Sequence, residues 1–134
     1  MGGTAIDVLR GFFLDRKKSD LIRIRCAQVL METEADAYAP SLIAEFTEAK
    51  QKKHTNLYNN FLKILGTATS SHLEGLAAGF LASGDLNEKS LAMDIVVNNG
   101  FNALIPALQE LSEGKNASLA RKAKVSLDKL GRKD

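Results

Sequence analysis

Hydrophobic positions recur at helical spacing along nearly the whole chain. Apolar residues three and four positions apart form one stripe per segment, as in Leu57, Phe61, Ile64 and Leu65. No stretch alternates apolar and polar residues over four or more positions convincingly, so strands are not expected. The pattern predicts eight helices, near residues 4–14, 20–33, 37–49, 55–67, 71–83, 87–98, 102–112 and 117–130.

Residues that start and end helices agree with this pattern. Ser71 and Glu74 stand three apart before an apolar run, the spacing of a capping box. Gly100 and Gly131 follow apolar stripes, where glycine suits the left-handed conformation that ends a helix. The other predicted N-caps are Ser19 or Asp20, Thr55, Asn87 and Asn116.

The helices group into pairs that suggest an internal repeat. The only prolines, Pro40 and Pro106, lie 66 residues apart, twice a period of 33, and each precedes an apolar helical segment. Four antiparallel helix pairs then follow within a single domain of residues 1–134. They cover residues 4–33, 37–67, 71–99 and 102–131.

The last pair resembles a HEAT repeat, a helical-pair module that grades into armadillo repeats. Its first helix contains Leu104-Ile105-Pro106-Ala107-Leu108, and its second carries a stripe of Leu119, Ala123, Leu127 and Leu130. In the first pair, Asp20 and Arg23 resemble the aspartate and arginine that HEAT repeats often carry. The resemblance is specific only in these two pairs. It implies an all-α fold, a short right-handed α-solenoid of about four helix pairs, with a closed helical bundle as the alternative.

Composition limits the classes of protein that fit. The chain has 134 residues, 45% of them hydrophobic, which is enough for a core, and a formal net charge of +2. No apolar run reaches the length of a membrane span, so we expect no membrane partner. The N-terminus lacks a secretory pattern, and a cytoplasmic location is the expectation.

Few residues are suited to catalysis. Histidine occurs only at His54 and His72, each in or beside a turn and without a second ligand at metal-binding spacing. Cys26 occupies a small position in an apolar stripe, as a packing cysteine does. We therefore expect no catalytic residues, no cofactor and no metal, and predict that the protein is not an enzyme.

The resemblance implies a protein-interaction scaffold that grips its partner with the inner layer of second helices. The candidate protein-binding residues are the polar positions of that layer: Arg23, Gln28, Asn59, Asn60, Lys63 and Asp94. Phe12 and Phe13 leave an apolar N-terminal flank that we expect to pack on another copy of the chain or on residues outside this sequence. A third hypothesis, an accessory subunit like the HEAT-like lyases that attach chromophores, has no specific residues in its favour.

Nucleic-acid binding is the main alternative function. Two inter-helix turns are basic, and equivalent turns of a stacked solenoid align along one edge. The candidate basic edge consists of Arg16, Lys17, Lys18, Lys50, Lys52 and Lys53. The low net charge and the scarcity of aromatic residues favour a protein partner over a nucleic acid.

Overall fold

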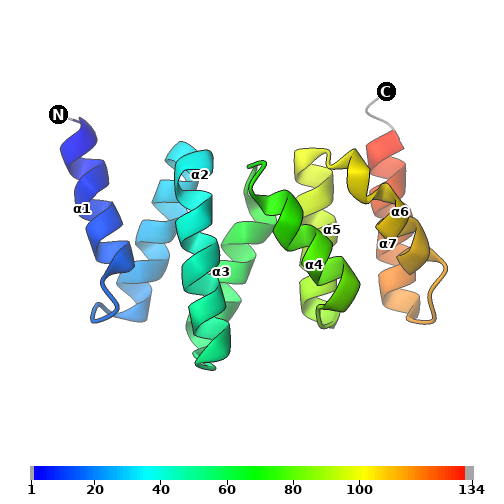
Figure 1. The fold of residues 1–134 in the computed structure, drawn as a ribbon, viewed down its shortest axis with the longest axis horizontal. Helices are drawn as coiled ribbons and strands as arrows, with labels where there is room; N and C mark the ends of the chain where they lie inside the picture. Colours follow the sequence, from blue (N-terminus) through cyan, green and yellow to red (C-terminus); the bar gives the residue numbers. More distant parts are fainter. Residues whose placement is uncertain (1, 132–134) are drawn as a thin grey trace. The chain divides into compact units, whose positions relative to one another are not determined.

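The computed structural model describes residues 2–131, except for the side chains of residues 2–6 and of Ser83. Every regular element in this part of the chain is helical, which confirms the all-α prediction (Figure 1). The ends of the predicted domain, residue 1 and residues 132–134, lie outside the described residues. The elements are α1 (Gly2–Leu14), α2 (Asp20–Gln51), α3 (Thr55–Thr67), α4 (Leu73–Ser83), α5 (Leu86–Asn99), the 3-10 turn η1 (Asn102–Leu104), α6 (Ile105–Ser112) and α7 (Ala117–Gly131).

Helix α2 combines the second and third predicted helices. Its backbone leaves the helical region at Glu34, with φ −145° and ψ 73°, inside the predicted connection. Glu32 and Asp36 would be like charges one turn apart in an unbroken helix, and Pro40 lacks the amide hydrogen that would bond to the carbonyl of residue 36. The two halves of α2 consequently run in opposite directions (Figure 1).

Three of the predicted helix ends are confirmed. The hydroxyl of Ser19 accepts from the backbone N–H of Ile22 at 3.3 Å, and Asn116 Oδ1 accepts from that of Leu119 at 3.0 Å. Gly100 ends α5 in the left-handed conformation, at φ 66°. Gly131, by contrast, is still helical as the last residue of α7.

Three other predictions about helix starts are wrong. Ser71 belongs to a turn, in which its carbonyl accepts from the backbone N–H of Glu74, and α4 begins after His72 without a side-chain cap. The capping box lies instead at the start of α5, where Asp85 rather than Asn87 is the N-cap. Helix α3 already includes Thr55, and its N-cap, His54, makes no side-chain hydrogen bond to the helix start.

The chain divides into two compact units, Met1–Ala68 and Thr69–Asp134, called here unit 1 and unit 2. In unit 1, α2 packs against both α1 and α3. Phe13 of α1 and Phe61 of α3 meet edge to face with ring centroids 5.9 Å apart, and both rings are buried. Aromatic contacts of this kind add to the burial of apolar surface, so this pair fixes α1 against the rest of the unit.

Unit 2 contains two stacked helix pairs. Helix α4 packs on α5 and α6 on α7, while α5 also contacts α7 and α4 contacts α6. Its core includes Leu73, Met93, Ile95 and Leu108, all with exposed fractions of 0%. Contacts between equivalent helices of successive pairs are those of a repeat array. A solenoid running through the whole chain, as opposed to a closed bundle, stays a prediction.

Candidate functional site

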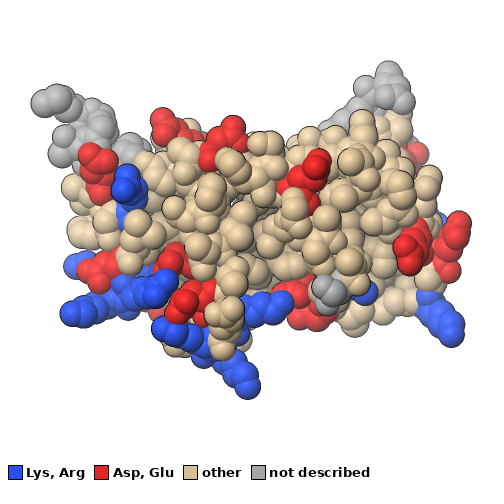
Figure 2. Space-filling view, in the orientation of Figure 1, with Lys and Arg blue, Asp and Glu red and all other residues tan. Residues whose placement is uncertain are grey.

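The two basic turns of unit 1 lie side by side. The first joins α1 to α2 and carries Arg16, while the second ends α2 and carries Lys52. Arg16 reaches across to Glu45 in the second half of α2, and Lys52 pairs with Glu48 on the same helix at 2.6 Å. Figure 2 shows Lys and Arg gathered, among acidic neighbours, over the end of unit 1 where these turns lie. Arg16 and Lys52 both pair with Glu48, so the two turns are close together within this unit, while a basic edge formed by all six candidate residues stays a prediction.

Glu45 joins the first turn to the first half of α2 through two guanidinium groups. Arg16 donates to both of its carboxylate oxygens, Nε to Oε1 at 3.1 Å and Nη2 to Oε2 at 3.0 Å. Arg23 donates from Nη2 to Oε1 at 2.6 Å. Two positive charges thus share one buried carboxylate, and Glu45 raises the pKa of the Arg16 guanidinium above its ordinary value through this hydrogen bond and its charge.

Arg23 does not lie on an open helix face, contrary to the prediction for it. Its exposed fraction is 5%, and its Nε donates to the carbonyl oxygen of Phe13 at 3.0 Å. The guanidinium also lies over the ring of Phe61, with Cζ 5.9 Å from the centroid. A buried guanidinium needs such partners because its desolvation is costly. The side chain therefore ties the end of α1 to α2 from inside the unit.

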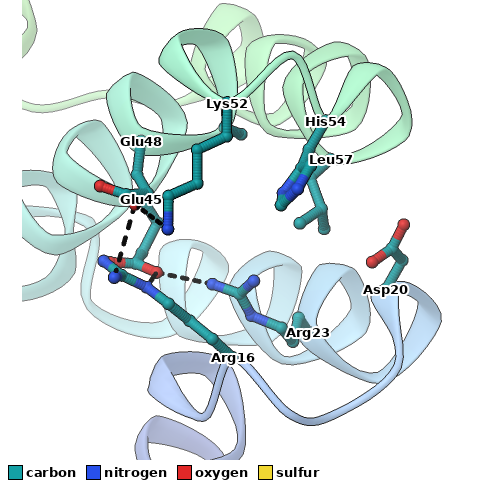
Figure 3. Close-up of a pocket in the computed structure, with 9 residues that line it drawn as sticks. Arg16, Asp20, Arg23, Glu45, Glu48, Lys52, His54 and Leu57 are labelled. Atoms are coloured by element: carbon teal, nitrogen blue, oxygen red, sulfur yellow. Dashed lines mark hydrogen bonds and ion pairs between the residues drawn. The ribbon is translucent and has the colours of Figure 1, made fainter.

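A cavity of about 280 Å³ opens beside this ion cluster. Figure 3 shows the imidazole of His54 and the amine of Lys52 turned toward it, with Asp20 on the opposite side. Asp20 accepts from the side-chain amide of Asn56 at 3.1 Å. The residues lining the cavity are Arg16, Asp20, Arg23, Glu45, Glu48, Ala49, Lys52, His54 and Leu57.

Glu48 is the second acidic partner in this cluster. A hydrogen bond from Lys52 holds the pKa of its carboxyl below the ordinary value, and the charges of Lys52, Arg16 and His54 act in the same direction. Arg16 Nη1 lies 3.6 Å from its Oε1. The cavity is thus lined by ion pairs, in which Glu45 and Glu48 are paired with the arginine and lysine side chains around them.

The remaining candidate basic residues are less constrained. The amine of Lys18 lies 5.0 Å from the ring centroid of Phe12, a cation–π contact. Within the described part of the chain, no carboxylate pairs with Lys17 or Lys53. Lys53 adopts the left-handed conformation at φ 58°, which is uncommon for a residue other than glycine. Lys50 is exposed near the end of α2.

The candidate protein-binding residues divide between the units. Gln28, Asn59 and Lys63 are exposed in unit 1. The Asn60 amide is half-buried and donates to the backbone and side chain of Asn56. Asp94 belongs to unit 2, where it lies 3.1 Å from Lys122. A common binding surface for these positions stays a prediction.

Exposed apolar side chains gather at the start of unit 1. The predicted N-terminal flank is half right: Phe12 is 40% exposed, but Phe13 is buried at 1% because it packs on Phe61. Of the eight large apolar side chains that are exposed in the described structure, six lie in α1 and the first half of α2. These six, called here the apolar flank, are Val8, Phe12, Leu14, Leu21, Ile22 and Val29.

The sequence reasoning missed the three acids of the cavity. Glu45 lies between buried Leu42 and Phe46 and one turn before buried Ala49, so it occupies a core position. A carboxylate in such a stripe signals a buried ion pair, because charged residues are rarely buried without a partner. The sequence predicts Asp20 only as a cap or a HEAT-like turn residue, and Glu48 carries no comparable signal.

The histidines and the cysteine do not form a catalytic or metal-binding group with one another in the described structure. Both histidines are exposed, and Cys26 is buried, which raises the pKa of its thiol. Among the described residues, no three His, Cys, Asp or Glu side chains gather in a way that could hold a metal ion. None of the helices in residues 2–131 combines the length and apolar character that a membrane span needs.

Comparisons of the chain with protein-family models, with curated proteins and with solved structures each found no match.

Proposed function

We propose that the chain is a non-catalytic protein-binding adaptor and that unit 1 carries its binding surface. The observation that carries this proposal is the apolar flank, since six of the eight exposed large apolar side chains of the described structure belong to α1 and the first half of α2, and exposed apolar surface on folded domains marks interaction surfaces. The HEAT-like resemblance agrees with it, because that family is dominated by interaction scaffolds.

The flank and the first basic turn together indicate the chemistry of the partner. Phe12 and Leu14 precede the turn and Leu21 and Ile22 follow it, while residues 16–18 between them are all cationic. A segment that presents apolar and acidic side chains together would complement both features. We place the partner here rather than on the second helices because Arg23, Asn60 and Asp94 already make contacts within the protein.

Two matched leucines test this proposal. Leu21 in the flank is 64% exposed and Leu86 in unit 2 is 60% exposed, so serine at either position should affect folding alike. We expect Leu21→Ser to weaken binding of a captured and then purified partner about tenfold, the size typical of an interface anchor. Leu86→Ser should leave the affinity unchanged. Equal losses, or no loss with Leu21→Ser, would refute the proposal.

The same experiment separates two other outcomes. Sedimentation of the protein alone detects self-association, which Leu21→Ser would abolish if a second copy covers the flank. Detectable turnover of any substrate would overturn the non-catalytic assignment.

Nucleic-acid binding remains a second candidate because the two basic turns adjoin in unit 1. Lys17 and Lys53 would then contact phosphates, and affinity for an oligonucleotide would fall steeply with salt. We expect changing Lys17, Lys18, Lys52 and Lys53 to glutamate to abolish such binding. Retention of the partner after nuclease treatment and at moderate salt would exclude this alternative for that partner.

A further inference from the structure

The Arg23 guanidinium has one end that the protein does not use. Nε and Nη2 bond to Phe13 and Glu45, but Nη1 has no hydrogen-bond partner among the described residues. No fully buried side-chain nitrogen or oxygen in that part of the structure lacks a partner, so Nη1 must be reached through the cavity. Figure 3 shows it pointing toward the space between Lys52 and His54. Arg23 is only 5% exposed, yet its Nη1 borders the cavity as a donor without a partner among the described residues.

The start of α3 adds further donors beside the same cavity. Its N-cap, His54, makes no side-chain cap bond, and both His54 and Leu57 line the cavity. Within the described structure, the backbone N–H groups of residues 55–57 bond to no acceptor, whereas that of Tyr58 bonds to the carbonyl of His54. The N-terminus of a helix carries partial positive charge and favours anions.

The charges around the cavity favour a single anion over a polyanion. Glu45 accepts from two guanidinium groups and Glu48 pairs with Lys52, which leaves the Nη1 end of Arg23 unmatched. The lining holds three cationic and three acidic side chains, so its charges balance and give no net attraction for a continuous chain of phosphates, and an anion bound there depends on individual donors such as Nη1. About 280 Å³ is also at the lower limit for small-molecule pockets, and it suits one side chain.

We propose that this cavity binds one carboxylate side chain from an acidic and apolar segment of a partner protein. Nη1 of Arg23 is the principal donor, with Lys52 and His54 beside it. The apolar residues of the segment then contact the apolar flank, outside the cavity. This inference rests on the proposed function and adds the group that is recognised.

The first test observes Arg23 directly in the unmodified protein. The probe is a short peptide of alternating glutamate and leucine, with glutamine in place of glutamate as its control. We expect the glutamate peptide to shift the side-chain nitrogen resonances of Arg23 and not those of Arg121, an exposed arginine in unit 2. An unmoved Arg23, or equal binding of the glutamine peptide, would overturn the proposal.

Variants at the cavity should change the affinity for the peptide in opposite directions. Lys52→Gln should weaken peptide binding about tenfold, as expected for the loss of one charge-assisted contact, while Lys124→Gln in unit 2 should not. Glu48→Gln removes a competing carboxylate and should strengthen binding. His54→Gln should weaken peptide binding roughly threefold, and His72→Gln, at the start of α4, which also lacks a side-chain cap, should leave it unchanged. Weakening by Glu48→Gln would contradict the assignment.

Two further probes identify the source of the anion. Inorganic phosphate and oligothymidylate are titrated against the same Arg23 resonances, and a shift with either but not with the peptide would overturn the carboxylate assignment. If peptide binding fails while Leu21→Ser still weakens partner binding, the inference fails and the proposed function stands. If Leu21→Ser has no effect on partner binding but the glutamate peptide binds at Arg23, the proposed function fails and the carboxylate assignment stands.

Discussion

Each unit buries one glutamate, and the two are held in different ways. Glu45 of unit 1 is 8% exposed and bonds to Arg23 and Arg16, which lie 22 and 29 residues away in the sequence. Glu88 of unit 2 is 1% exposed and takes part in the capping box of its own helix. Its carboxylate accepts from the backbone N–H of Asp85 at 3.1 Å, and its own N–H donates to Asp85 at 2.8 Å.

Glu45 therefore stabilises tertiary packing, whereas Glu88 stabilises the start of a single helix. The glutamate of unit 1 fixes distant segments against one another, so its loss affects the packing of α1 on α2. The capping box of unit 2 satisfies N–H groups at one helix start, so its loss affects α5. The unit with the ionic cluster also holds the cavity and the apolar flank, while unit 2 has only two exposed large apolar side chains, Leu86 and Val125, among those described.

The largest expected effect comes from Glu45. Glu45→Ala leaves Arg23 buried without its carboxylate, which should destabilise unit 1 by about 3–5 kcal/mol. Hydrogen exchange should then rise in α1 and the first half of α2, and the urea midpoint should fall. The exposed Glu110 of unit 2 supplies the control variant Glu110→Ala, with a change near zero. A loss below about 1 kcal/mol would show that the cluster does not hold unit 1 together.

Asp85 gives the corresponding test in unit 2. Asp85→Ala removes the side chain that caps α5, at an expected cost of about 1 kcal/mol. Faster exchange should be concentrated at the start of α5 rather than spread across unit 2. Asn87 is exposed in the first turn of the same helix and makes no cap bond, so Asn87→Ala should be nearly neutral. Equal effects of the two variants would contradict the capping role of Asp85.

Two residues in the left-handed conformation, one in each unit, should respond to substitution with opposite changes in stability. Lys53 and Gly100 both follow a helix, and in each case the next residue donates back to a helix carbonyl, His54 to Ala49 at 2.9 Å and Phe101 to Val96 at 3.1 Å. Gly100→Ala should destabilise the protein by about 1 kcal/mol, because a Cβ disfavours this conformation. Lys53→Gly should stabilise it by about 0.5–1 kcal/mol. Denaturant midpoints that move in the same direction would refute this account.

Much of the architecture could be predicted from the sequence. The apolar period placed the helices within a few residues, because each stripe is a local property of its own segment. The caps at Ser19 and Asn116 followed from side chains close to the amides they bond. The break near Glu34 was also expected, although α2 continues on both sides of it.

The site was less predictable because it depends on contacts between distant residues. The polar side chain of Arg23 suggested an open face, yet Glu45 and the carbonyl of Phe13 supply the partners that let it be buried. The sequence does not distinguish Phe13 from Phe12, but Phe13 packs on Phe61 and is buried. Most such pairings leave no local pattern in the sequence. A charged residue inside an apolar stripe is the one signal that points to them.

The smallest expected effect is a pH dependence that belongs to unit 1. Since the pKa of Glu48 is lowered in the folded protein, mainly by its hydrogen bond with Lys52, the unfolded chain binds the proton more tightly. The stabilisation is therefore complete above the ordinary glutamate pKa of about 4.3 and is lost as the pH falls through the lower folded value. Glu48→Gln should lower the urea midpoint at neutral pH, and the difference from the wild type should shrink in acid. Glu113→Gln, at an exposed position of unit 2, supplies the control. A difference that grows in acid would have the wrong sign for a carboxylate stabilised by Lys52.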